Sequence, residues 1–243
     1  NEKNYAQLVR NSGRPWIIQV YNEDSSLSQS FSRFWEEFIE EYPFINFGRL
    51  HTKLAASIVK KLPFAVLELP LIFSYVPGAD SELFEYDADR SPNSPFTLFL
   101  RSSLSHAHSS ISVSQLKNLM SKRPAKPTLI FIAADSTPVA FLYHSAVFRK
   151  SFDFKITQIN ELQETRALFS GQRPKVVFLP SSPNLSMQLF DCESPQKAVF
   201  TAVNYAKFAT TPSLFRHSFA DFCLDKIKHT DRENKLPSIC IIA

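Results

Sequence analysis

Glycine is scarce in this sequence, and cysteine motifs are missing. Only four of its 243 residues are glycine, which argues against the glycine-rich loops that let a backbone approach a phosphate closely. The three cysteines, Cys192, Cys223 and Cys240, form no Cys-x-x-Cys pair, so neither a zinc ribbon nor a local redox pair is predicted. The sequence therefore predicts no bound cofactor and no metal site.

Long apolar runs and clustered charges are absent as well. The longest apolar stretches, such as 128–134 and 175–179, are strand-sized and fall well short of the roughly 20 residues that cross a bilayer. Basic residues outnumber acidic ones by 27 to 23, but they are scattered, whereas a nucleic-acid-binding surface gathers them on one face. We therefore expect no contact with a membrane and no nucleic acid among the partners.

A short phrase recurs three times along the chain. A proline, one further residue and a run of β-forming residues begin at Pro15, Pro127 and Pro237, about 110 residues apart. The phrase suits the start of a buried strand, and a period of this length indicates repeated whole domains. We predict one domain at 1–124, a second at 125–235, and the first strand of a third repeat at 236–243, which should pair with a sheet because an exposed edge invites aggregation.

The segments that follow the first two phrases show the same order of elements. The first copy comprises strand 16–21, an amphipathic helix from about 27 to 39, strand 44–50, helix 52–60 and strand 69–73. The second comprises strand 129–133, a helix up to about 150, strand 154–159, helix 161–170 and strand 173–178. We also expect a strand at 96–101 and closing helices at 113–121 and 214–226. This order predicts an α/β fold with two tandem domains, each a mixed sheet covered by helices on both faces.

This pattern resembles the thioredoxin superfamily, and in particular the tandem domains of protein disulfide isomerase relatives. In that family the first strand leads into a Cys-x-x-Cys motif, and here Val20-Tyr21-Asn22-Glu23-Asp24-Ser25-Ser26-Leu27-Ser28 puts Ser25 and Ser28 in the places of the two cysteines. In the second copy Ser136 and Val139 stand there. The resemblance implies thioredoxin-like domains without oxidoreductase activity, because a serine hydroxyl is not ionised at neutral pH and forms no disulfide.

The family also has a cis-proline that faces the motif at the start of the third core strand. Leu69-Pro70 and Arg173-Pro174 match this position, so the resemblance implies two cis peptide bonds. The motif loop and the residue before the proline can offer backbone groups to an extended peptide. The implied peptide-binding positions are Asp24, Ser25, Ser26, Ser28, Leu69, Pro70, Asp135, Ser136, Arg173 and Pro174.

Within the superfamily, the chain is similar to the repeats that follow the J domain in endoplasmic-reticulum cochaperones of the Hsp40 type. The features that carry this similarity are the Phe-rich first helix, the degenerate motifs and the ending Phe219-Ala-Asp-Phe-Cys-Leu224. No His-Pro-Asp motif occurs, so any J domain would lie outside this chain. The resemblance implies a non-catalytic module that binds unfolded or extended polypeptide clients in the endoplasmic reticulum lumen, with an Hsp70-type chaperone contacted through other regions; the cytoplasm is the alternative location.

Two features depend on an oxidising secretory compartment. Cys223 and Cys240 could form a disulfide worth about 3 kcal/mol, and two buried thiols are the other interpretation. The same pair supports an alternative function, an unconventional thiol-disulfide redox protein. Asn184-Leu185-Ser186 is a glycosylation sequon, and Asn184 is expected to be exposed and able to carry a glycan.

The sequence around Ser25 and the histidines suits structural or solvent-exposed roles better than catalysis or metal binding. Asp24, Ser25 or Ser26 suits the N-cap of the helix that follows. A nucleophilic serine would need a positioned base, and the nearest histidine in sequence is His51. His106 and His108 would share one face of an extended strand, but no third metal ligand is suitably spaced. We therefore expect capping rather than hydrolysis, and solvated histidines rather than a metal site.

Overall fold

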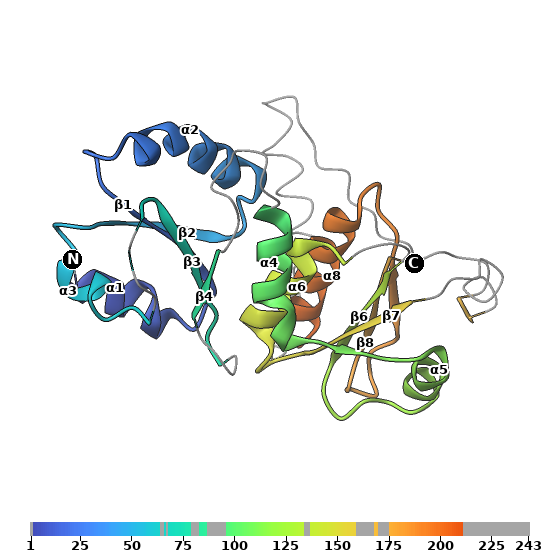
Figure 1. The fold of residues 1–243 in the computed structure, drawn as a ribbon. Helices are drawn as coiled ribbons and strands as arrows, with labels where there is room; N and C mark the ends of the chain where they lie inside the picture. The colour runs from blue at the N-terminus through green and yellow to red at the C-terminus, as the bar shows by residue number, and fades with distance from the viewer. Residues whose placement is uncertain are drawn as a thin grey trace, which may run out of the picture. The chain divides into compact units, whose positions relative to one another are not determined.

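The computed structural model describes residues 2–63, 66, 68–78, 83–86, 96–133, 137–158, 168–169 and 175–210. The chain divides into two compact units, one formed by Asn1–Ala107 with Leu142–Phe148 and the other by His108–Phe141 with Arg149–Ala243. Each unit is built on one mixed sheet, of four strands in the first unit and five in the second (Figure 1).

The first sheet has the strand order β2-β1-β3-β4. Strands β1 and β2 run parallel, β3 is antiparallel to β1, and β4 is antiparallel to β3. The elements of this unit, in chain order, are α1 (Glu2–Leu8), η1 (Arg10–Ser12), β1 (Trp16–Tyr21), α2 (Ser26–Glu41), β2 (Asn46–His51), α3 (Ala56–Val59), β3 (Leu71–Tyr75), β4 (Leu83–Glu85), α4 (Phe96–Leu104) and η2 (Ser105–Ala107).

Helices cover both faces of the first sheet (Figure 1). Because side chains alternate along a strand, Ile18 and Val20 of β1 point to one face, where they pack in a core with side chains of α1 and α3. Helix α2 covers the other face, and α4 packs against α2, with the rings of Phe38 and Phe96 stacked at a centroid distance of 3.9 Å. The neighbouring residues Ile17 and Gln19, both fully buried, therefore face α2.

The second sheet has the strand order β5-β7-β6-β8-β9. Strand β7 runs parallel to β5 and β6, whereas β8 is antiparallel to β6 and β9 is antiparallel to β8. The elements from residue 108 onward, in chain order, are β5 (Ser109–Ser110), α5 (Val113–Ser121), β6 (Thr128–Ala133), α6 (Val139–Phe148), β7 (Asp153–Gln158), β8 (Val176–Leu179), β9 (Gln188–Phe190) and α8 (Pro195–Thr210).

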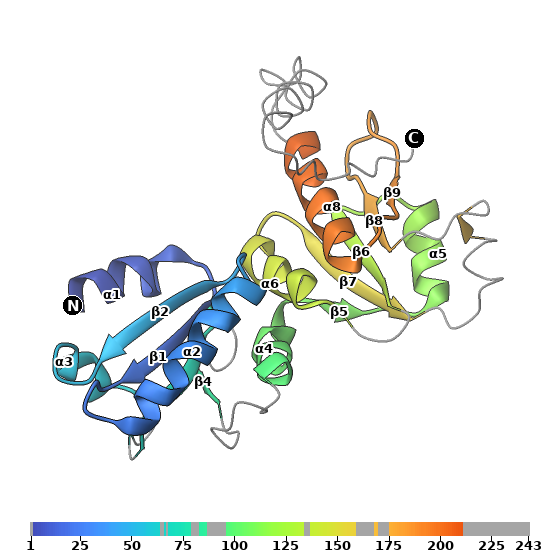
Figure 2. The same cartoon turned by 90° about the horizontal axis from the view of Figure 1, so that it is seen from above.

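The second sheet is also covered on both faces (Figure 2). On one face Leu116 of α5 packs with Ile130 of β6. On the other face Phe141 of α6 lies 5.5 Å from the ring of Phe131, and Tyr205 of α8 packs edge-on against a phenylalanine of β8. The predicted α/β fold of two mixed sheets with helices on both faces is thus confirmed.

Two predictions for the segment between the sheets were wrong. Residues 96–101 form part of helix α4 rather than a strand, because the buried positions Phe96, Phe99, Leu100, Ser103 and Leu104 follow the spacing of three and four that a helix requires. Helix α5 has the predicted bounds, 113–121, but it packs against the second sheet and does not close the first. In the first unit it is α4 that packs against α2.

Other elements differ in extent or lie outside the described residues. Helix α3 is a single turn, shorter than the predicted 52–60. Helix α8 was not predicted; its buried face is formed mainly by alanines, with Val199 and Val203. Most of the predicted helix 161–170 lies outside the described residues. The predicted helix 214–226 and the predicted strand 236–243 lie outside them completely.

Candidate functional site

Three connections meet at one end of the first sheet because of its strand pairing. Val20 lies opposite Leu71 in the antiparallel pair, and Tyr21 lies beside His51 in the parallel pair. The loop after β1, the turn after β2 and the residues before β3 therefore share this end, which is called the motif end here and comprises residues 21–29, 49–54 and 69–70. The Leu69–Pro70 bond at this end is cis, as predicted.

The hydroxyls of Ser25 and Ser28, the two serines predicted to replace the family's cysteines, fix the conformation of the loop between β1 and α2. Ser25 is the N-cap of α2, and its Oγ accepts a hydrogen bond from the backbone N–H of Ser28 at 3.3 Å. Ser28 is buried, and its own Oγ accepts from the backbone N–H of Asn22 at 3.4 Å. Both hydroxyls therefore stabilise the entry into α2, as serine does at N-caps, and the capping role expected for this segment falls to Ser25.

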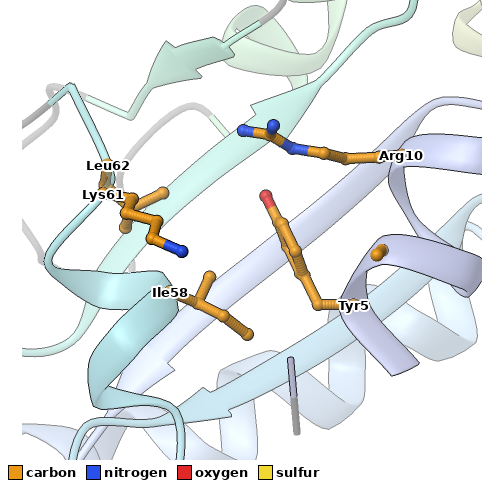
Figure 3. A pocket seen from close by; sticks show the side chains of 6 residues that line it. Tyr5, Arg10, Ile58, Lys61 and Leu62 are labelled. Carbon is orange, nitrogen blue, oxygen red and sulfur yellow. The ribbon is translucent and has the colours of Figure 1, made fainter. Parts of the chain in front are cut away.

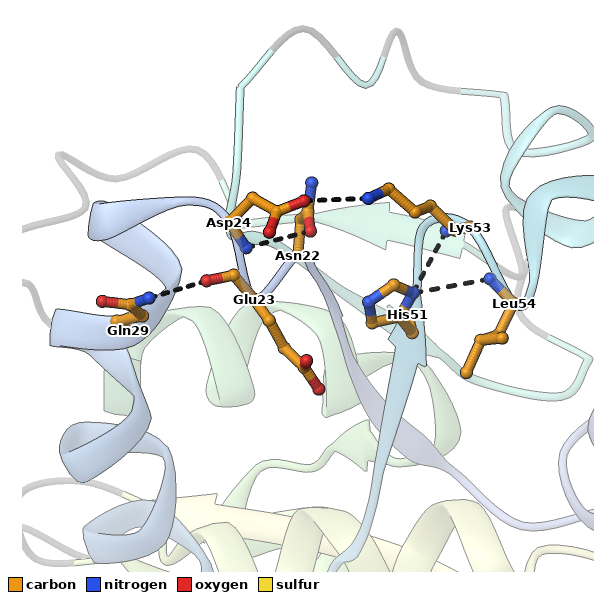
Figure 4. A network of polar contacts seen from close by, with 7 residues as sticks. All are labelled: Asn22, Glu23, Asp24, Gln29, His51, Lys53 and Leu54. Atoms are coloured by element: carbon orange, nitrogen blue, oxygen red, sulfur yellow. Dashed lines mark hydrogen bonds and ion pairs between the residues drawn. The ribbon is translucent and has the colours of Figure 1, made fainter.

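Further polar contacts fix the loop between β1 and α2 (Figure 4). The side-chain carbonyl of Asn22 accepts from the backbone N–H of Asp24 at 3.1 Å, and the side-chain amide of Gln29 donates to the carbonyl of Glu23 at 2.7 Å. Asp24 Oδ2 also lies 2.8 Å from Lys53 Nζ, and this hydrogen bond holds the pKa of the Asp24 carboxyl below its ordinary range. The ion pair links the loop after β1 to the turn after β2.

Tyr21, the last residue of β1, is flanked by two side chains of β2. The guanidinium carbon of Arg49 lies 4.3 Å from the centre of the Tyr21 ring, a cation–π contact. The imidazole of His51 packs edge-on against the same ring, with centroids 5.3 Å apart. Arg49 and His51 are two residues apart on one strand, so they project from the same face of the sheet.

His51 is not placed to activate a serine. Its Nδ1 accepts hydrogen bonds from the backbone N–H groups of Lys53 and Leu54, at 3.2 and 3.4 Å (Figure 4). Nδ1 thus already accepts two backbone hydrogen bonds, and Ser25 Oγ is engaged in capping. A serine nucleophile needs a hydrogen-bonded base, and the polar contacts at the motif end do not supply that arrangement.

An open pocket of about 330 Å³ lies at the motif end, on the face that α2 covers. Its lining residues are Tyr21, Asn22, Glu23, Ser28, Gln29, Ser32 and Arg49. The volume is at the lower limit of the roughly 300–1,000 Å³ typical of ligand pockets, and every lining residue carries a polar group. Such a pocket suits a side chain or backbone segment of a polypeptide better than a large apolar ligand.

Two exposed leucines border this end of the sheet. Leu27 in the first turn of α2 is 56% exposed, and Leu54 in the turn after β2 is 81% exposed. Leu69 is half-buried against the core, and Pro70 is buried. Of the predicted positions in the first copy, the fold thus brings Asp24, Ser25, Ser26, Ser28, Leu69 and Pro70 to a single end of the sheet.

The second copy is described only in part. Asp135, Ser136, Arg173 and Pro174 lie outside the described residues, so the predicted second cis bond remains a prediction. Val139, which was predicted to take the place of the second cysteine, begins α6 and is buried.

The remaining predicted site residues belong to loops and to the end of the chain. Cys223 and Cys240 also lie outside the described residues, whereas Cys192 is 3% exposed. Asn184 of the sequon is exposed in the turn between β8 and β9. In the part of the chain that the structure describes, no group of three or more His, Cys, Asp or Glu side chains could hold a metal ion. Nor does any described helix have the length and apolarity needed to cross a membrane.

Comparison with solved structures places the fold among thioredoxin-like proteins. Full-length ERdj5 aligns with a TM-score of 0.52 and 16% identity over 86% of this chain and 32% of that chain. A second crystal form of ERdj5, form I, gives 0.51 and 14% over 87% of this chain and 30% of the other. The chain has the thioredoxin-like fold, and it spans about a third of the length of ERdj5. The first two thioredoxin domains of Eps1p from Saccharomyces cerevisiae also match, with a TM-score of 0.33 and 14% identity over 87% of this chain and 96% of that chain.

No family model and no curated protein matches the sequence.

The structure adds residues to the motif end that the sequence did not predict. Arg49, Lys53 and Leu54 come from β2 and the turn after it, more than 20 residues beyond the motif. The sequence feature that points to these residues is the predicted parallel pairing of the two strands, because parallel strands end at the same edge of a sheet. The residues around the end of the second strand, at His51, are therefore expected beside Tyr21.

Proposed function

We propose that this chain is a non-catalytic polypeptide-binding module of a protein-folding factor. The observation that carries the proposal is the composition of the motif end: Ser25 caps α2 and Ser28 accepts a backbone hydrogen bond, at the positions where the family is expected to have its reactive thiols. The open polar pocket and the exposed Leu27 and Leu54 lie at the same end. This arrangement keeps a surface for an extended peptide and supplies no nucleophile for thiol-disulfide exchange.

The two leucines are the main source of binding free energy in this proposal. Burying apolar surface stabilises a complex by roughly 25 cal/mol per Å², and Leu27 and Leu54 are exposed enough to lose much of their accessible surface to a client. The pocket beside Tyr21 would accept polar or backbone groups of the same client. Clients would therefore be unfolded polypeptides that carry apolar side chains, not one defined sequence.

A binding measurement on a leucine variant tests the proposal. Fluorescence anisotropy of labelled, reduced and carboxymethylated α-lactalbumin would give the Kd for the wild-type chain and for a Leu27→Asp/Leu54→Asp variant. We expect the double variant to bind about tenfold more weakly, which corresponds to about 1.4 kcal/mol. Leu98→Asp on α4 is the matched control, because Leu98 is 58% exposed, and it should bind like the wild type.

Equal Kd values for the wild type and the double variant would overturn the assignment of the motif end. Insulin reduction by the purified chain would contradict the non-catalytic proposal. Turnover that disappears in a Cys223→Ser variant would instead support the alternative, a redox protein that uses Cys223 and Cys240.

The proposal also covers the cellular compartment of the protein and its chaperone partner. We propose that the module works in the endoplasmic reticulum lumen, and that an Hsp70-type chaperone is contacted through regions outside this chain. The exposed Asn184 sequon supports a lumenal location because glycans are attached there. Expression through the secretory pathway should yield a glycosidase-sensitive mass increase that Asn184→Gln abolishes. An unmodified Asn184 would remove this support.

A further inference from the structure

A second, smaller pocket lies between α1, η1 and α3, away from the motif end. It has a volume of about 170 Å³ and is lined by Tyr5, Ala6, Arg10, Ile58, Lys61 and Leu62 (Figure 3). Sites for small molecules generally measure roughly 300–1,000 Å³. This pocket is thus too small for a cofactor and has room for about one side chain.

The Tyr5 hydroxyl marks the polar part of this pocket. Tyr5 is 8% exposed, and no described residue accepts a hydrogen bond from its Oη, since the neighbouring Arg10 guanidinium can only donate to this oxygen. Figure 3 shows this oxygen pointing into the space between the side chains of Arg10 and Lys61. Leaving a buried hydroxyl proton without an acceptor destabilises the folded chain. A ligand that accepts a hydrogen bond from Tyr5 would remove that cost.

The charges around the hydroxyl favour an anionic acceptor. Burial raises the pKa of Tyr5, and the neighbouring Arg10 opposes this rise. The guanidinium is therefore close enough to stabilise negative charge at the position of the phenol oxygen. A guanidinium also binds carboxylates through two parallel hydrogen bonds, and Lys61 adds a second cationic side chain to the lining.

The turn that carries Arg10 is held against the sheet before any ligand binds. The hydroxyl of Tyr75 on β3 donates to the carbonyl of Arg10 at 3.2 Å. Ser12 Oγ donates to the carbonyl of Val9 at 2.9 Å, and Trp16 Nε1 donates to Ser12 Oγ at 3.2 Å. These bonds fix the backbone of η1, so little conformational entropy is lost when a ligand is bound.

The apolar part of the lining distinguishes between anions. Ala6, Ile58 and Leu62 surround the polar groups with aliphatic surface, which suits a carboxylate attached to a short hydrocarbon stem better than a fully hydrated phosphate. We propose that this pocket binds a polypeptide carboxylate, either of an acidic side chain or of a chain terminus, with Tyr5 and Arg10 on its oxygens and Ile58 and Leu62 along its stem. The site shares no residue with the motif end and does not depend on the function proposed for it.

Methyl NMR on the full 243-residue chain tests this site directly. The Ile58 δ1 methyl signal would be followed during titration with N-acetylglutamate N-methylamide, which has only a side-chain carboxylate, and with N-acetylalanine, which has only a terminal one. We expect a saturable shift with at least one, and the one that binds more tightly identifies the source of the carboxylate. The uncharged N-acetylglutamine N-methylamide should bind at least tenfold more weakly. Equal binding by inorganic phosphate or by the glutamine compound, or no saturable shift with either acid, would overturn the proposal.

Variants separate recognition from a structural role. Arg10→Gln should weaken binding at least tenfold, and Tyr5→Phe should weaken it several-fold, because each removes a donor to the carboxylate. Tyr5→Phe should not lower the unfolding temperature, since the phenylalanine keeps the ring and the lost hydroxyl donates to no described residue. Arg14→Gln, an exposed neighbour outside the pocket lining, is the control and should bind normally. Unchanged affinity in both Arg10→Gln and Tyr5→Phe would refute the site.

Discussion

Lys53 Nζ lies 2.8 Å from Asp24 Oδ2, and this ion pair joins the loop after β1 to the turn after β2. Both side chains are 71% exposed, so solvent screens the pair and its effect on stability is small. The ion pair instead fixes the position of Asp24, which precedes the helix cap, relative to the turn that carries Leu54. Whether the pair forms in solution therefore tests the arrangement of the motif end.

We predict that Lys53→Gln raises the pKa of the Asp24 carboxyl toward its ordinary value. The ion pair lowers the pKa of the Asp24 carboxyl in the folded chain. The small stabilisation from the pair is therefore present above the pKa of this carboxyl in the unfolded chain, about 4, and is lost as the pH falls through its lower pKa in the folded chain. A carboxyl-detected NMR titration checks the shift, and 1 M salt should move the wild-type pKa in the same direction. Lys122→Gln in the second unit is the control. An Asp24 pKa that Lys53→Gln leaves unchanged would mean that the pair does not form in solution.

Restoring two thiols tests the frame in which Ser25 and Ser28 replace the family's cysteines. A Ser25→Cys/Ser28→Cys variant should acquire thiol-disulfide exchange, because Ser25 caps α2 and a helix N-terminus lowers the pKa of a thiol below its free value of about 8.5. The pH dependence of alkylation, quantified on the peptide containing residue 25, measures that pKa. Ser30→Cys, at an exposed position further along α2, should alkylate with an ordinary pKa. A variant without exchange activity would show that the frame is wrong.

Gln19 is a buried polar residue that the structure leaves without a described partner. It is fully buried in β1, and neither its amide nitrogen nor its oxygen has a hydrogen bond among the described residues. Since burying an unpaired amide costs roughly 1–3 kcal/mol, Gln19→Met should stabilise the first unit by about 1–2 kcal/mol. Urea unfolding followed by tryptophan fluorescence isolates this unit, because both tryptophans of the chain, Trp16 and Trp35, belong to it.

The control for this substitution is Gln158→Met, at the exposed end of β7. It should change stability by less than about 0.5 kcal/mol, as surface substitutions usually do. A Gln19→Met variant that is less stable than the wild type would show that the amide is hydrogen-bonded in solution and has a structural role under α2.

The fold could be predicted where local pattern and long-range repetition agreed. The strand Trp16–Tyr21 has the predicted bounds, because its proline start and β-forming residues are unambiguous signals. The segment Phe96–Leu104 was misread because its aromatic content favours a strand, while the burial of its residues follows helical spacing. Helix α8 escaped prediction because alanines dominate its buried face, and small residues give a weak hydrophobic pattern.

The candidate site was predicted only at the positions that match the family's motifs. Ser25, Ser28 and Pro70 followed from a motif frame, but the contact of Arg49 with Tyr21 depends on the register between β1 and β2. The pocket of Tyr5 and Arg10 had no sequence signal, because its two sides come from α1 and α3, more than 45 residues apart. Tertiary packing alone brings such residues together.

The three cysteines give the last prediction, which concerns the compartment. Cys192 is 3% exposed, and burial of this kind shields a thiol from oxidants and alkylating reagents. In protein secreted through an oxidising lumen, non-reducing peptide mapping should therefore show Cys192 as an unmodified thiol and a disulfide between Cys223 and Cys240. Closing that loop should stabilise the chain by about 3 kcal/mol, so Cys223→Ser and Cys240→Ser should lower stability equally, whereas Cys192→Ala should leave the linkage intact. Two alkylatable thiols at 223 and 240 in unreduced protein would contradict the disulfide and weaken the proposed lumenal location.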